Sequence, residues 1–119
     1  MRLIAAVLTG VLLSGGALAC QPQFVESTWI ENVIKRNPSA VIVELNDEQR
    51  EVFMRNYNAV PPASNDKADK VLVFRKPHPA PPVTPSILVA FFNNGCAVKA
   101  EIIPTPIFLR LLLDEQPGA

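Results

Sequence analysis

Apolar residues recur at helical spacing between residues 25 and 36. Val25, Trp29 and Val33 stand four residues apart, which predicts an amphipathic helix over residues 25–36. The residue before a proline avoids helical geometry, so we expect this helix to end ahead of Pro38.

The pattern then changes from helical spacing to a β-branched run and back again. Residues 39–45 read Ser-Ala-Val-Ile-Val-Glu-Leu, which favours a strand. Asn46 follows in a position to cap a second helix, with Gln49 at the capping-box position, and Pro61-Pro62 ends that helix. Residues 70–76 predict another strand after a polar loop.

The clearest local signal is Asn94-Gly95, a pair typical of a two-residue type I′ hairpin turn. It predicts a hairpin of strands 86–93 and 96–103, in which Phe91 faces Val98. That register assigns the residues of one apolar face as Ile87, Val89, Phe91, Val98, Ala100 and Ile102, with Cys96 at its edge. It assigns those of the other, half-exposed face as Leu88, Ala90, Phe92, Lys99 and Glu101.

Two segments flank this hairpin. Residues 77–85 hold five prolines and His78, so we expect an extended connector between neighbouring strands. Thr105-Pro106 is a helix start signal, and the apolar run 107–113 predicts a short helix. That helix is either buried in the core or exposes an apolar face to a partner, and the sequence leaves both open.

The elements therefore follow the order α-β-α-β-β-β-α. This order predicts a small α+β domain, with a mostly antiparallel sheet of three to four strands and the helices packed on one face. Four large apolar residues are expected in one core, namely Trp29, Phe53, Phe91 and Leu112.

The first 19 residues have the features of a removable export signal. Arg2 precedes an apolar run to Leu13, and Ala17-Leu18-Ala19 supplies a small-x-small cleavage pattern. The run is too short for a membrane span, which favours cleavage. We therefore expect a signal peptide over 1–19, a short leader over 20–24 and one domain over 25–119.

Cys20 and Cys96 are the two cysteines of the chain, and they allow two exclusive fates. Residues 17–20 resemble the lipid-attachment motif of bacterial lipoproteins, although Ala and Leu stand in the reverse of their usual places. Lipidation of Cys20 would anchor the chain to a membrane. In an oxidising compartment, Cys20 would instead pair with Cys96 in a disulfide. The expected location is periplasmic, membrane-anchored as a lipoprotein, or secreted.

Composition excludes several classes of function. The chain carries 11 basic and 11 acidic residues, so no basic excess points to nucleic acid. At 49% hydrophobic and 18% charged residues, the composition is that of a folded protein. One histidine, between two prolines, is a poor base for catalysis, and we expect no metal or other cofactor.

These observations favour an exported, non-catalytic protein that binds or supports another protein of the cell envelope. The alternatives are a secreted inhibitor or accessory subunit of an enzyme, and a small hydrolase that uses carboxylates. The candidate interaction surface consists of the proline connector and the half-exposed sheet face, with residues His78, Leu88, Phe92, Lys99 and Glu101.

Overall fold

A four-stranded antiparallel sheet forms the centre of the molecule. The computed structural model describes residues 20–76 and 85–113, and the expected signal peptide and His78 lie outside them. The strands are β1 (Val41–Glu44), β2 (Lys70–Arg75), β3 (Ser86–Asn93) and β4 (Cys96–Pro104). Their order in the sheet is their order in the chain, so β1 and β4 form its two edges.

Within the described ranges, three α-helices accompany the sheet, and their positions in the chain confirm the predicted α+β class and element order. They are α1 (Glu26–Arg36), α2 (Asp47–Ala59) and α3 (Thr105–Leu111). Asn46 caps α2 as expected, because its side chain accepts the N–H of Gln49 and the Gln49 side chain accepts the N–H of Asn46. The expected leader contains a short 3-10 helix, Pro22–Phe24.

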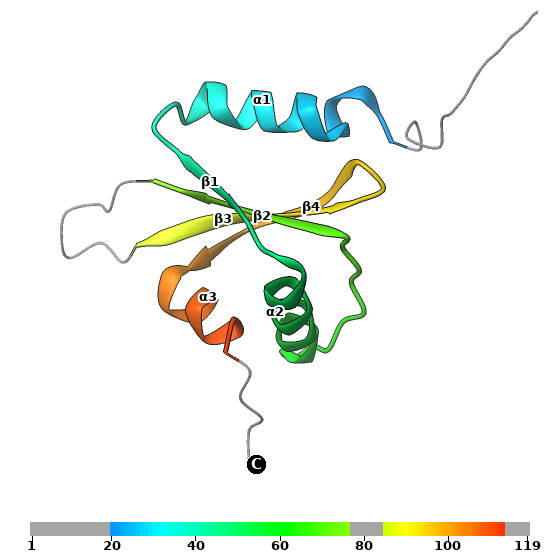
Figure 1. The fold of residues 1–119 in the computed structure, drawn as a ribbon, viewed down its shortest axis with the longest axis vertical. Coiled ribbons are helices and arrows are strands. Elements are labelled where there is room, and N and C mark those ends of the chain that lie inside the picture. The colour runs from blue at the N-terminus through cyan, green and yellow to red at the C-terminus, as the bar shows by residue number, and fades with distance from the viewer. Residues whose placement is uncertain (1–19, 77–84, 114–119) are drawn as a thin grey trace, which may run out of the picture.

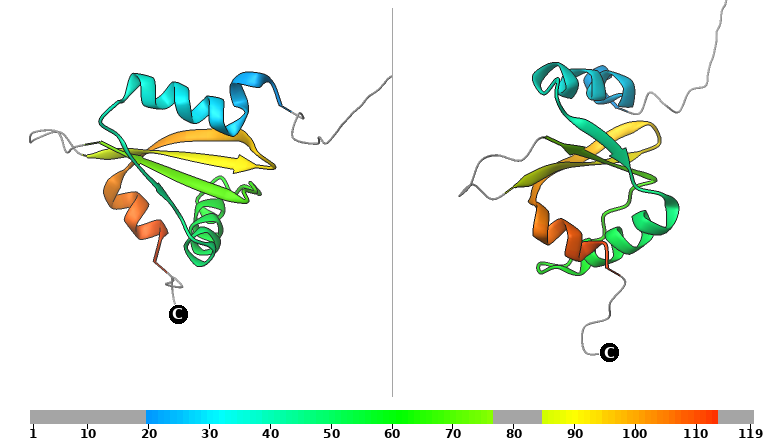
Figure 2. Two further views of the ribbon diagram at one scale, coloured as in Figure 1. Left: turned by 45° about the horizontal axis from the view of Figure 1, so that its top comes forward. Right: turned by 60° about the vertical axis from the view of Figure 1, so that its left-hand side comes forward.

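The prediction that all helices share one face of the sheet is wrong for α1. Figures 1 and 2 show α1 on one side of the sheet, with α2 and α3 on the other. Each face therefore has its own core. The α1 side buries Leu72, Phe74, Ala90 and Phe92, whereas the α2 side buries a larger set that includes Phe53, Phe91 and Phe108.

The single predicted core is corrected in the same way. Trp29 belongs to the α1 side, where its ring lies edge-on to Phe74 and Phe92, with centroids 5.7 and 5.6 Å away. Phe53 and Phe91 meet on the opposite side, and Leu112 packs there as well. Alternate residues of β2 and β3 feed the two cores, because successive side chains of a strand point to opposite faces.

The predicted hairpin is present, but its register differs from the prediction after the turn. Asn94 and Gly95 have φ values of 54° and 80°, as a type I′ turn requires. Asn93 pairs with Cys96, and a β-bulge then shifts the register, so that Phe91 pairs with Lys99 instead of Val98. Every later residue of β4 thus faces the side opposite to the one predicted.

The apolar run of the C-terminal helix α3 is partly buried in the core and partly exposed. Phe108 is buried against Phe53, with ring centroids 5.5 Å apart, whereas Ile107 and Leu109 are exposed. The helix starts one residue earlier than expected, since Pro104 is its N-cap and Thr105 is its first residue. The helix therefore contributes to the core through one face and leaves another apolar face in solvent.

Candidate functional site

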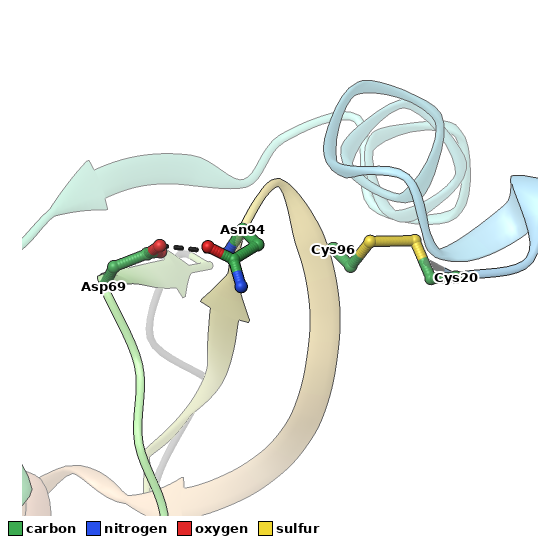
Figure 3. Close-up of a disulfide and its surroundings, with 4 residues drawn as sticks. All are labelled: Cys20, Asp69, Asn94 and Cys96. Atoms are coloured by element: carbon green, nitrogen blue, oxygen red, sulfur yellow. Dashed lines mark hydrogen bonds between the residues drawn. A yellow bond between two sulfur atoms is a disulfide. The ribbon is translucent and has the colours of Figure 1, made fainter. Parts of the chain in front are cut away.

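The two cysteines join the start of the described chain to the hairpin. Cys20 and Cys96 form a disulfide with their Cα atoms 6.2 Å apart, as one of the two predicted alternatives requires (Figure 3). A thioether to lipid would need the same sulfur atom of Cys20. The disulfide-linked chain is therefore a form in which Cys20 is not lipidated.

Backbone hydrogen bonds reinforce this connection. Val25 forms an isolated antiparallel bridge with Cys96, and Glu26 donates its N–H to the Gly95 carbonyl oxygen at 2.9 Å. On the other side of the turn, Asn94 donates its N–H to the Asp69 carboxylate at 2.9 Å (Figure 3). The exposed turn is therefore fixed from two directions.

The sequence-predicted interaction surface is not brought together. Phe92 is fully buried beneath Trp29, and Leu88 is half-buried on the same α1 side. Lys99 and Glu101 lie on the α2 side, because the bulge places them opposite Phe91 and Val89. His78 lies outside the described residues.

Lys99 and Glu101 instead take part in a polar cluster with Tyr57 of α2. The Tyr57 hydroxyl donates to Glu101 Oε1 at 2.5 Å. Lys99 Nζ lies 5.0 Å from the centroid of the Tyr57 ring and pairs with Asp66 Oδ2 at 2.9 Å. Asn58 holds Asp66 in place, since its side chain donates to the Asp66 carbonyl oxygen and accepts the Asp66 N–H.

The neighbours of Tyr57 and Lys99 make both groups hold their protons more tightly. Burial, followed by the hydrogen bond to Glu101, raises the pKa of the Tyr57 hydroxyl. The Tyr57 oxygen, followed by the Asp66 carboxylate, raises the pKa of the Lys99 ammonium. Lys99 is therefore a cation at neutral pH, which suits an ion pair and not a general base.

This cluster was missed at the level of sequence, because its four members are spread from residue 57 to residue 101. The sequence did hold one signal. Lys99 and Glu101 are two residues apart in a strand and so share a face, but the bulge decides which face that is.

A shallow pocket of about 210 Å³ lies on the α1 side of the sheet. Its apolar wall includes Val33, Phe74, Leu88 and Ile102, and Lys76 stands at its border. Leu88, a member of the predicted surface, thus lines this pocket.

Exposed aliphatic side chains gather at two further places. Three belong to α3 and the residues after it, namely Ile107, Leu109 and Leu113. Three others are consecutive in the edge strand β1, namely Val41, Ile42 and Val43. For the helix residues, the sequence analysis gave an exposed apolar face as one of two alternatives. For residues 41–43, it predicted a strand but not its exposure.

The described residues contain no group of three or more His, Cys, Asp or Glu side chains placed to hold a metal ion. None of the helices described here has the length and apolar character that a membrane span needs. A scan against models of protein families, a search of curated proteins and a search of solved structures each return no match.

Proposed function

We propose that this chain is an exported, disulfide-stabilised module that binds another protein of the cell envelope and performs no catalysis. The Cys20–Cys96 disulfide carries this proposal. Protein disulfides persist in oxidising compartments, and Cys20 directly follows the residues that resemble an export signal. The disulfide also favours an unlipidated form over a lipoprotein.

The exposed aliphatic residues of α3 support the binding part of the proposal. Ile107 and Leu109 are about half exposed, and Arg110 lies beside them in solvent. The buried centre of a protein interface is more apolar than the rest of the surface, and arginine is enriched in interfaces. Phe108 anchors the helix in the core, so this face is presented on a fixed element.

The non-catalytic part of the proposal is supported by the polar cluster around Tyr57. Lys99 is paired with Asp66, and the Tyr57 hydroxyl is engaged by Glu101. Both raised pKa values keep these groups protonated at neutral pH, which suits them to holding α2 against β4.

A secreted inhibitor or accessory subunit is the second candidate, and the hairpin turn favours it. Asn94 and Gly95 are exposed, yet Asp69, Glu26 and the adjacent disulfide fix them. A loop that is rigid before binding loses little conformational entropy on a target, as an inhibitory loop requires.

The test uses the full-length chain expressed in a bacterial host with a photo-reactive amino acid at Leu109. We expect the intact mass of residues 20–119 less two hydrogens, and a covalent adduct to an envelope protein after illumination. The matched control places the photo-reactive group at Glu51, an exposed position on α2, and should give no such adduct.

Each readout can contradict one part of the proposal. An uncut or reduced chain in the cytoplasm would rule out export, and added acyl mass would identify a lipoprotein. Adducts from a group at Asn94 but not at Leu109 would favour the inhibitor reading. Equal labelling from Leu109 and Glu51 would remove α3 as the binding surface.

A further inference from the structure

The strand β1 forms one edge of the sheet and exposes consecutive aliphatic side chains. Val41, Ile42 and Val43 are 58%, 36% and 40% exposed, which is unusual for three consecutive aliphatic residues of a strand. Figures 1 and 2 show β1 at one margin of the sheet, with α1 and α2 on opposite sides of it.

The backbone of this edge has hydrogen-bonding groups to offer. Leu45 donates its N–H to the Val71 carbonyl oxygen at 3.0 Å, in register with the β1–β2 pairing. Successive residues of an antiparallel strand direct these groups to alternate sides. The N–H and C=O groups of Ile42 and Glu44 therefore point away from β2, towards any strand that joins the edge.

The opposite edge of the same sheet is blocked. Val25 bridges the start of β4 at Cys96, and Pro104 ends that strand. Between them lie the bulge and the charged residues Lys99 and Glu101. Bulges, charges, prolines and short strand length are the usual protections of an edge strand against pairing, and β1 has only its length of four residues and Glu44, at its end.

We propose that β1 pairs with β1 of a second copy of this chain, antiparallel, about a two-fold axis at Ile42. In this register, Ile42 lies opposite Ile42 of the second copy, and Val41 lies opposite Val43 of the second copy. Glu44 lies opposite Ala40 of the second copy, so no like charges meet. The two sheets become one continuous eight-stranded sheet, since each has four strands.

The charges beside β1 agree with this arrangement. Lys35 and Arg36 end α1 just before β1, and Asp47 and Glu48 begin α2 just after it. An antiparallel pair brings the start of each strand beside the end of the other. The basic ends of the two copies therefore lie at opposite ends of the strand pair, and so do the acidic ends, so the two-fold arrangement keeps like charges apart.

Sedimentation of the purified, oxidised protein tests the proposal. We expect a concentration-dependent dimer. Ile42→Pro should give a folded monomer, because it removes an N–H that faces away from β2 and proline is tolerated at such edge positions. Ile102→Lys alters an exposed isoleucine of the opposite edge strand and should remain dimeric.

Charge variants test the register itself and do not depend on the proline. Ile42→Lys and Ile42→Glu should each be monomeric, because identical charges would meet at the axis, and their mixture should recover a one-to-one heterodimer. A monomeric wild type, a dimeric Ile42→Lys variant, or a mixture that stays monomeric would overturn the proposal. These outcomes do not depend on whether the chain is exported.

Discussion

At the scale of single residues, Tyr57 and Lys99 connect the folded state to pH. Both groups have pKa values raised above their ordinary values of 10.0 and 10.5. A raised pKa means that the folded state holds the proton more tightly than the unfolded state does. The resulting stabilisation is complete below the unfolded pKa and is lost as the pH rises through the folded pKa.

We therefore expect the free energy of unfolding to fall above about pH 10, the ordinary range of tyrosine and lysine titration. Tyr57 is the only tyrosine of the chain, so the absorbance of tyrosinate follows this residue alone. Its titration midpoint should be higher in the folded protein than in denaturant.

The matched variant for this measurement is Tyr57→Phe, which keeps the ring beside Phe53 and Phe91 but removes the hydroxyl. Its stability should fall less steeply at alkaline pH than that of the wild type. Equal slopes for the two proteins would show that titration of the Tyr57 hydroxyl does not contribute to the pH dependence.

At the scale of elements, the hairpin depends on the backbone of one glycine. Gly95 has a φ of 80°, and a Cβ added there would meet nothing within 4 Å. Gly95→Val should therefore destabilise the protein by about 1–3 kcal/mol through backbone strain alone, measured by urea unfolding. Gly95→Asn should lose less, because asparagine tolerates positive φ.

This pair of variants separates strain from crowding. If valine and asparagine cost the same, side-chain contacts and not the turn conformation would be responsible. If neither changed the unfolding midpoint, the left-handed conformation of Gly95 would not be needed for the hairpin.

Some features of the helices and strands could be predicted from the sequence, and others could not. The turn, the capping box of α2 and the order of elements follow from local rules about φ and hydrogen bonding, and all three are confirmed. The bulge near Val98 could not be predicted, because the local sequence does not show where a strand leaves one residue unpaired. One such residue moves every later side chain of the strand to the opposite face of the sheet.

The division of helices between the two faces was also beyond local rules. Alternation along β3 places Phe91 and Phe92 on opposite sides, so the sheet has two apolar faces to cover. The stripe on α1 is compatible with either face. Its docking through Trp29 depends on tertiary contacts that no short segment contains.

At the scale of the whole molecule, the disulfide closes a loop with a sequence separation of 76 residues. Replacing both cysteines with serine should lower the free energy of unfolding by about 4 kcal/mol, because the unfolded chain regains the freedom of that loop. Urea unfolding of the double variant, beside the reduced wild type, measures the loss.

The reduced wild type is the control, since it keeps both cysteine side chains and removes only the covalent bond. The two forms should unfold at similar urea concentrations. A loss below about 1 kcal/mol in both would mean that the unfolded chain is already compact around this loop.

The positions of Cys20 and Cys96 in the chain also determine when the disulfide can form during export. A chain threaded across a membrane from its amino end presents Cys20 first, and Cys96 only after β1, β2 and β3 have followed it. If the chain is exported as proposed, the disulfide can form only after β1, β2 and β3 have crossed the membrane. Formation of this disulfide would then indicate that translocation is nearly finished, and a chain stalled before Cys96 would keep Cys20 unpaired with Cys96.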